Sequence, residues 1–174
     1  MAEKVEKTRE YVDKVVSVNR VTKVTKGGKT FSFSAFVVSG DQQGRAGMGI
    51  GKSREVSSAI AKATAKARKN LISIALRDTT IPYNVLGKHG ASKVIICSAY
   101  KGTGVIAGGV MRKVMEAVGI KDVLAKSLGS SCGINVAKAT FNALAKCRSA
   151  EYLAQLRGKT VKDITKGVSD EKAK

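Results

Sequence analysis

The hydrophobic pattern of the chain becomes regular only after a charged N-terminal stretch. Residues 1–13 alternate in charge without an apolar face, and we expect them to form a flexible arm. The next two runs, VVSVNRVTKVTK and KTFSFSAFVVSG, are rich in β-formers and flank Gly27 and Gly28. A Gly-Gly pair suits the tight turn of a hairpin, which requires positive φ angles. The pattern predicts a strand, a two-residue turn and a second strand.

A third strand and a long helix follow this hairpin. The turn SGDQQG leads into a glycine-rich strand over residues 45–51, and connections this short join antiparallel strands. Apolar residues then recur at helical spacing, which predicts a helix with one stripe facing the sheet. That stripe comprises Val56, Ile60, Ala63, Ala67, Leu71 and Ile74. Residues 14–78 are therefore expected to form a β-β-β-α domain.

A second domain is predicted after Pro82, the only proline, which marks a boundary within RDTTIPYN. The apolar run SKVIICSAY suits a buried strand. Helices are expected over residues 108–118 and 135–147, with an extended segment between them. Such alternation predicts an α+β domain over residues 82–150, and the fold class is α+β. Residues 151–174 read as a tail, with a short helix before disordered final residues.

Charge sets the class of partner. The 174 residues include 32 Lys and Arg against 13 Asp and Glu, a net charge of +19, while 43% hydrophobic residues allow a folded core. Residues 14–77 hold 13 basic and 2 acidic residues. This balance favours a polyanion as partner. Lys62, Lys66 and Lys69 form a ridge away from the apolar stripe; a solvated face is the ordinary interpretation, but the regional excess of charge favours phosphate contact.

Aromatic residues are too few for base stacking to be the main mode of binding. They make up 5% of the chain, and there is no Trp. Recognition through shape and backbone is therefore favoured. Phe31 and Phe33 alternate with serines on the second predicted strand, as in a stacking platform, but such alternation is more typical of a half-buried strand. We expect both rings to be buried against the helix.

The stretch GRAGMGIGKSREV raises the question of a nucleotide-binding loop. Gly51, Lys52 and Ser53 fit the end of the P-loop pattern GxxxxGK[ST], but Ala46 stands where the first glycine belongs. A P-loop also follows a buried parallel strand, whereas this segment follows a hairpin. These mismatches argue against a phosphate-loop NTPase.

A second glycine pattern lies downstream. Gly102, Gly104 and Ala107 fit the dinucleotide fingerprint GxGxxA, with Asp122 at the spacing of its acidic residue. No clear second βαβ strand surrounds Asp122, so the match is weak. The alternative is that glycines permit close backbone packing, or approach to an anionic partner such as RNA.

Candidate catalytic and metal-binding residues are scarce. His89 is the only histidine, and the three cysteines (Cys97, Cys132, Cys147) form no CxxC pair. We therefore expect buried reduced thiols, no metal or cofactor, and no catalysis. No apolar run reaches the length of a membrane span, and the N-terminus has no signal-peptide core, so we expect a soluble cytoplasmic protein.

Two long motifs resemble one known family. NRVTKVTKGGKTFSFSAFVVSGDQQGRAGMGIGKSREVSSAIAKA resembles the N-terminal part of bacterial small-subunit ribosomal protein S-five, and GTGVIAGGVMRKVMEAVGIKDVLAKSLGS resembles its C-terminal domain. RGKTVKDI is similar to its tail. The similarity spans about residues 11–165 in the same order. One departure is Cys132-Gly133, where related sequences often have Asn-Pro.

The resemblance implies a first domain similar to double-stranded-RNA-binding domains and a non-enzymatic role. It implies a structural constituent of the small ribosomal subunit that is monomeric there, binds small-subunit ribosomal RNA, supports assembly and contributes to decoding accuracy near the messenger entry and neck. Ribosomal proteins S-four and S-eight are the implied neighbours. A free double-stranded-RNA-binding regulator and a nucleotide-dependent enzyme are the alternative functions.

The expected contacts follow from both arguments. The resemblance implies that the hairpin reaches RNA near the spectinomycin site through Lys23, Thr25, Lys26, Gly27, Gly28 and Lys29. Charge and glycine content add Arg20, Arg45, Gly49, Lys52, Arg54 and the ridge of Lys62, Lys66 and Lys69. The resemblance also assigns Gly102, Gly104 and Arg112 to a protein interface, the contact with S-four.

Overall fold

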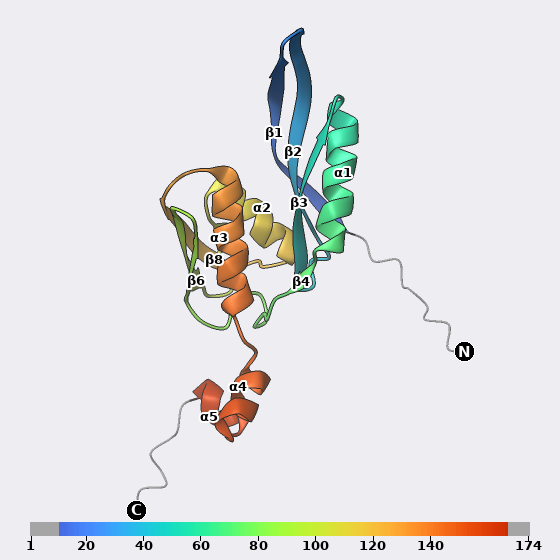
Figure 1. Cartoon of the computed structure of the whole chain (residues 1–174). Coiled ribbons are helices and arrows are strands. Elements are labelled where there is room, and N and C mark those ends of the chain that lie inside the picture. The colour runs from blue at the N-terminus through green and yellow to red at the C-terminus, as the bar shows by residue number, and fades with distance from the viewer. Residues whose placement is uncertain (1–10, 167–174) are drawn as a thin grey trace, which may run out of the picture.

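The first lobe is an antiparallel sheet with one helix on one face, seen in a computed structural model that describes residues 11–166 (Figure 1). Its strands lie in the order β1 (Val12–Thr25), β2 (Gly28–Gly40), β3 (Arg45–Ser53) and β4 (Ile72–Ser73). The helix is α1 (Val56–Lys69). The predicted β-β-β-α order is confirmed, and the short β4 is an addition that the sequence did not reveal.

Two boundaries of the hairpin differ from expectation. β1 begins at Val12, so residues 12 and 13 belong to the sheet and not to an arm; residues 1–10 of that predicted arm lie outside the described residues. The turn is formed by Lys26 and Gly27, one residue earlier than predicted, because Thr25 pairs with Gly28. Gly28 nevertheless has the positive φ that the prediction required, at 145°.

The helix is shorter than its apolar pattern suggested. α1 ends at Lys69, and the chain then turns into β4, so Leu71 and Ile74 do not extend its stripe. The buried face of α1 consists of alanines, namely Ala59, Ala63 and Ala67. Val56, predicted to face the sheet, is 39% exposed. The stripe prediction is confirmed at Ala63, Ala67 and the partly buried Ile60, which packs against the cluster beneath the helix. It is wrong at Val56, which is exposed, and at Leu71 and Ile74, which lie beyond the end of α1.

The glycines of β3 explain the alanines on the buried face of α1. Gly47, Gly49 and Gly51 occupy alternate positions and present one face of the strand to α1. A Cβ atom added to Gly49 would lie 2.1 Å from the carbonyl oxygen of Ala63. At Gly47 and Gly51 the same atom would lie 2.3 Å from a helix carbonyl oxygen. The glycine-rich stretch therefore allows α1 to pack closely against β3 and is not a nucleotide-binding loop.

The second lobe is a mixed four-stranded sheet covered by two helices. Its strands lie in the order β5 (Val85–His89), β6 (Ser92–Ser98), β8 (Val123–Gly129) and β7 (Val105–Ile106), with β7 parallel to β8. The helices are α2 (Gly109–Val118) and α3 (Gly133–Lys146), and two short helices, α4 (Ala150–Arg157) and α5 (Val161–Lys166), follow. Cys132 is the N-cap of α3 without a side-chain hydrogen bond, and it is exposed, so the expectation of a buried thiol is wrong there although Cys147 is buried. The α+β class is confirmed, and the predicted tail holds two helices, with residues 167–174 outside the description.

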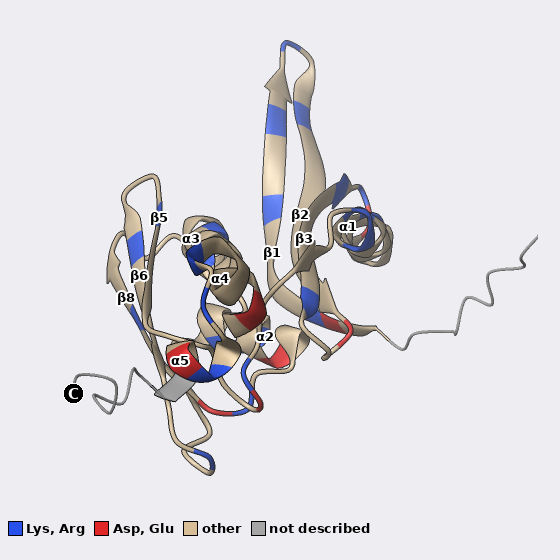
Figure 2. Ribbon diagram, turned by 90° about the horizontal axis from the view of Figure 1, so that it is seen from below, with Lys and Arg blue, Asp and Glu red and all other residues tan. Residues whose placement is uncertain are grey.

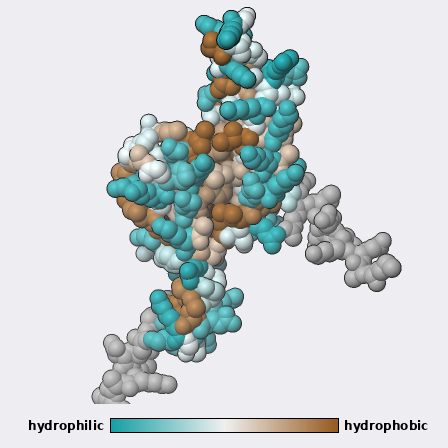
Figure 3. Space-filling view, in the orientation of Figure 1, coloured by the Kyte–Doolittle hydropathy of each residue, from teal (hydrophilic) through white to brown (hydrophobic). Residues whose placement is uncertain are grey.

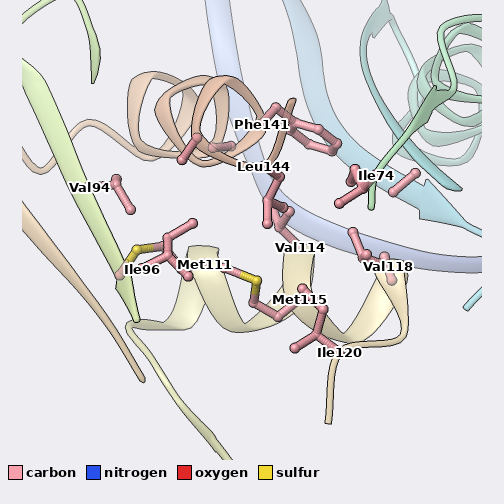
Figure 4. Packing of buried hydrophobic residues seen from close by; sticks show 14 of the residues in the cluster. Ile74, Val94, Ile96, Met111, Val114, Met115, Val118, Ile120, Phe141 and Leu144 are labelled. Atoms are coloured by element: carbon pink, nitrogen blue, oxygen red, sulfur yellow. The ribbon is translucent and has the colours of Figure 1, made fainter. Parts of the chain in front are cut away.

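The two lobes share one core. Alternation along β2 turns Ala35 and Val37 toward α1, and Phe36 and Val38 toward the second lobe. Phe36 and Val38 belong to the same buried cluster as residues of α2 and α3, including Val114, Val118, Phe141 and Leu144 (Figure 4). The first sheet is thus sandwiched between α1 and the second lobe (Figure 1).

Polar contacts also tie the lobes together. The amide of Gln42 donates to the carbonyl of Ala117 at 3.2 Å, and the amide of Gly44 donates to that of Val118 at 3.0 Å. The ammonium of Lys113 donates at 2.8 Å to the carbonyl of Val15, where β1 has an irregular register. These contacts fix the angle between the lobes and hold the base of the hairpin.

Candidate nucleic-acid interface

The β1–β2 hairpin projects past the start of α1 as a two-stranded arm (Figure 1). Every residue from Thr22 to Phe31 on this arm is exposed. Lys23, Lys26 and Lys29 line its end, and the sequence has no Asp or Glu between residues 14 and 40. Figure 2 shows Lys and Arg along both strands and at the tip. The arm is therefore a purely cationic projection.

The tip of this arm is ordered and open. The hydroxyl of Thr25 donates to the carbonyl oxygen of Gly28 at 3.1 Å, which closes the turn. A Cβ atom added at Gly27 or Gly28 would meet nothing within 4 Å. The absence of side chains at these two positions leaves the tip backbone accessible to a close-packed partner.

A groove lies between the hairpin and the beginning of α1. Four of its lining residues are cationic: Lys23, Lys52, Arg54 and Lys62. Its other lining residues are Val21, Thr22, Ser32 and Ser53. β3 delivers Lys52 to the N-terminal end of α1, where the helix dipole adds to the attraction for anions. The groove suits a phosphate backbone.

Lys62, Lys66 and Lys69 continue this positive surface along α1. All three are exposed and lie at i, i+4 and i+7, on one side of the helix. Arg68 is different, because its guanidinium lies 2.8 Å from the carboxylate of Asp13. Figure 3 shows mainly hydrophilic residues over the outer side of α1. The ridge is free for a partner, whereas Arg68 has an internal one.

The second glycine motif is occupied by a carboxylate of the chain itself. Oδ1 of Asp122 accepts hydrogen bonds from the amides of Gly102 at 2.9 Å and Gly104 at 3.0 Å. A hydrogen bond from the side chain of Thr79, together with these two amides, holds the pKa of Asp122 below its ordinary value of 3.8. A phosphate would compete with a buried anion for the same amides, so the geometry opposes a dinucleotide site.

Asp122 should make the second lobe sensitive to acid. Its folded pKa is depressed, so its stabilising contribution is complete above pH 3.8 and is lost as pH falls through the lower folded value. We expect urea-unfolding midpoints measured between pH 6 and pH 2.5 to fall more steeply for wild type than for Asp122→Asn. The variant should be less stable than wild type at pH 6. Parallel pH profiles for the two proteins would contradict this assignment.

Comparison with known proteins decides the family. The model described as "Ribosomal protein S5, N-terminal domain" matches residues 11–75, and "Ribosomal protein S5, C-terminal domain" matches residues 87–157. The "Small ribosomal subunit protein uS5" of Flavobacterium psychrophilum is 54% identical over 158 residues, which cover 91% of each chain. The chain belongs to the ribosomal protein S5 family. The resemblance seen in its motifs is confirmed.

Further relatives agree. The protein of the same name from Treponema denticola is 50% identical over 156 residues, 90% of each chain. That of Borreliella afzelii is 50% identical over 160 residues, which cover 92% of this chain and 97% of the relative. The S5 family is structural and non-enzymatic, which confirms the expectation against catalysis. These homologues are named as proteins of the small ribosomal subunit, in agreement with the predicted location there.

The S5 fold brings together most, but not all, of the predicted RNA contacts. The predicted hairpin residues form the tip of the arm, and the groove is lined by Lys52, Arg54 and Lys62. Arg45 is exposed but lies opposite Ser73, at the end of the sheet away from the tip. Gly49 is buried beneath Ala63, so the prediction that it contacts RNA is wrong. Its glycine character serves helix packing instead.

The aromatic prediction is corrected in part. Phe33 is half-buried against the alanine cluster beneath α1, as expected. Phe31 is 45% exposed, and the guanidinium of Arg20 lies over its ring. The expectation of burial failed because α1 does not extend over this part of the hairpin. Alternation along the strand gave no signal of where the helix begins to cover the sheet.

The residues assigned to a protein interface lie on two neighbouring segments of the second lobe: the glycines precede the edge strand β7, and Arg112 lies in the first turn of α2. Gly102 and Arg112 are exposed, and Gly104 is half-buried in the loop held by Asp122. Within residues 11–166, no group of three or more His, Cys, Asp or Glu side chains could hold a metal ion. No helix in that range has the length and apolarity needed to cross a membrane.

Proposed function

We propose that this chain is a structural constituent of the small ribosomal subunit that binds small-subunit ribosomal RNA through its hairpin, groove and ridge. The observation that carries the proposal is the succession of exposed Lys and Arg side chains from the tip at Lys26, through the groove at Lys52 and Arg54, to Lys69. Membership of the S5 family supports the ribosomal setting, since the relatives are named as small-subunit proteins.

The binding mechanism is electrostatic and preorganised. Lysines and arginines neutralise phosphates and release condensed counterions, so affinity falls steeply with salt. The sandwich of α1, the first sheet and the second lobe holds the base of the arm, which reduces the flexibility lost when RNA binds. The two glycines at the tip allow the backbone itself to approach the RNA.

The finer role follows the resemblance. We propose that the chain supports subunit assembly and contributes to decoding accuracy near the messenger entry and neck. The loop that carries Gly102 and Gly104, together with Arg112 on α2, is the proposed contact for ribosomal protein S-four, and S-eight is a further neighbour. The exposure of Gly102 and Arg112 is compatible with such an interface.

The hairpin contribution can be measured by a salt titration. We expect Lys26→Ala combined with Lys29→Ala to weaken binding of the full chain to small-subunit ribosomal RNA and to reduce the slope of log K against log salt by about one to two units. Both side chains are exposed, so the fold should be unchanged by circular dichroism.

The matched control removes two lysines from the other hairpin. Lys88 and Lys93 face each other across β5 and β6 and are also exposed, so Lys88→Ala with Lys93→Ala changes net charge equally. This control should keep the wild-type slope. Equal slopes for wild type and the Lys26 and Lys29 variant would exclude the tip as a phosphate contact.

A further inference from the structure

Arg20 and Phe31 form an exposed stacked pair on the hairpin. The central carbon of the Arg20 guanidinium lies 3.8 Å from the centroid of the Phe31 ring. The strand register places Arg20 opposite Phe33 and Phe31 opposite Thr22, so the pair crosses diagonally between the strands on one face. Cation–π packing at this distance holds the flat guanidinium against the ring.

This pair lies just beyond the reach of the core. Phe33 faces Ser53, the last residue of β3, and α1 begins at Val56. Phe31 is one step further along the same face and remains 45% exposed. Among residues 11–166, the guanidinium of Arg20 has no carboxylate within ion-pair distance. The pair is therefore neither buried nor neutralised.

The surroundings of the pair favour nucleic acid as its ligand. Thr22, directly opposite Phe31, lines the cationic groove together with Lys23, Lys52 and Arg54. A strand of RNA whose phosphates follow the groove would bring its bases to the neighbouring ring and guanidinium. Aromatic rings and guanidinium planes are the surfaces on which unpaired RNA bases stack.

We propose that Arg20 and Phe31 form a stacking site for one unpaired nucleobase of the bound RNA. The inference rests on the proposed function but goes beyond it, because it assigns recognition of a splayed-out base to a surface otherwise governed by phosphate contacts. Phe31 supplies the flat apolar surface and orients the guanidinium, whose in-plane N–H groups are left to bind an adjacent phosphate or base edge.

The affinity test separates stacking from charge. Phe31→Leu keeps an apolar side chain but removes the ring, and we expect the full chain to bind small-subunit ribosomal RNA about tenfold more weakly at every salt concentration. The salt slope should stay close to the wild-type value, because the substitution removes no cationic side chain. Phe31→Trp should restore affinity. Wild-type affinity for Phe31→Leu, or failure of Phe31→Trp to restore binding, would overturn the proposal.

A spectroscopic arm reports stacking directly. The chain contains no Trp, so Phe31→Trp introduces a single indole at the site. Its fluorescence should be quenched when RNA binds. Tyr152 on α4 provides the matched control, since it is 46% exposed and also lies beside an arginine. The central carbon of the Arg148 guanidinium lies 5.0 Å from the centroid of its ring. Tyr152→Trp should show no quenching; equal quenching at both positions would contradict a specific site.

Failure of this inference is distinguishable from failure of the proposed function. If Phe31→Leu binds like wild type while the variant lacking Lys26 and Lys29 loses salt slope, the arm binds RNA without stacking a base. If the full chain shows no salt-dependent binding to the ribosomal RNA, the proposed function itself fails.

Discussion

Gly49→Ala is expected to lower the free energy of unfolding by about 3 kcal/mol or more, the upper range for an overpacked core. The added methyl group would lie 2.1 Å from the carbonyl oxygen of Ala63 and 2.6 Å from the amide of Ala67. Both contacts are with helix backbone, which cannot rotate away as a side chain does. α1 would have to lift from the sheet, which would uncover the alanine cluster beneath it.

Gly109→Ala is the matched control for this result. It adds the same methyl group at the first residue of α2, where nothing lies within 4 Å. Its stability should equal or exceed that of wild type, because alanine is the better helix former. Urea unfolding followed by circular dichroism measures both variants. A loss below about 1 kcal/mol for Gly49→Ala would refute the close packing of α1.

Gly119→Ala should separate the two lobes as well as destabilise them, with an expected loss of about 3 kcal/mol from overpacking and left-handed strain together. Gly119 ends α2 with φ of 94°, and a methyl group there would lie 2.1 Å from the carbonyl oxygen of Gln42 in the first lobe. The neighbouring interlobe bond from the Gln42 amide to Ala117 would be disturbed. Hydrogen exchange should show the two lobes of wild type unfolding together and the two lobes of Gly119→Ala unfolding separately.

Gly158→Ala isolates the conformational part of this effect. Gly158 ends α4 in the same left-handed region, with φ of 59°, but nothing lies within 4 Å of its added methyl group. Gly158→Ala should lower the free energy of unfolding by no more than about 2 kcal/mol, and the loss of stability should be confined to α4. If Gly119→Ala unfolded in one transition with no greater loss than Gly158→Ala, the lobes would not depend on this contact.

Local patterns in the sequence predicted most of the elements. Alternation and the Gly-Gly pair indicated the hairpin, and helical periodicity indicated α1; the helices expected over residues 108–118 and 135–147 correspond to α2 and α3. These features depend on neighbours along the chain, which the sequence displays directly. The surplus of Lys and Arg over residues 14–77 likewise pointed to the hairpin and α1 as the cationic surface.

Contacts between distant segments were not predictable in the same way. The boundary predicted at Pro82 gave no indication that the two domains share a core, yet Phe36 and Val38 belong to the same buried cluster as Leu144. A strand that is buried on both faces has the same continuous apolar sequence whether a helix or a second lobe covers each face. The same limit explains Gly49, whose role depends on Ala63, and Asp122, whose partners are loop amides in a different segment.

The most direct test of the account is RNA cross-linking in small ribosomal subunits purified from cells that express this chain, after sedimentation through a sucrose gradient. The account predicts that the chain comigrates with small subunits and that its cross-linked peptides include the hairpin from Lys23 to Lys29. A chain that sediments free of small subunits, or cross-links that leave the hairpin unlabelled, would contradict it.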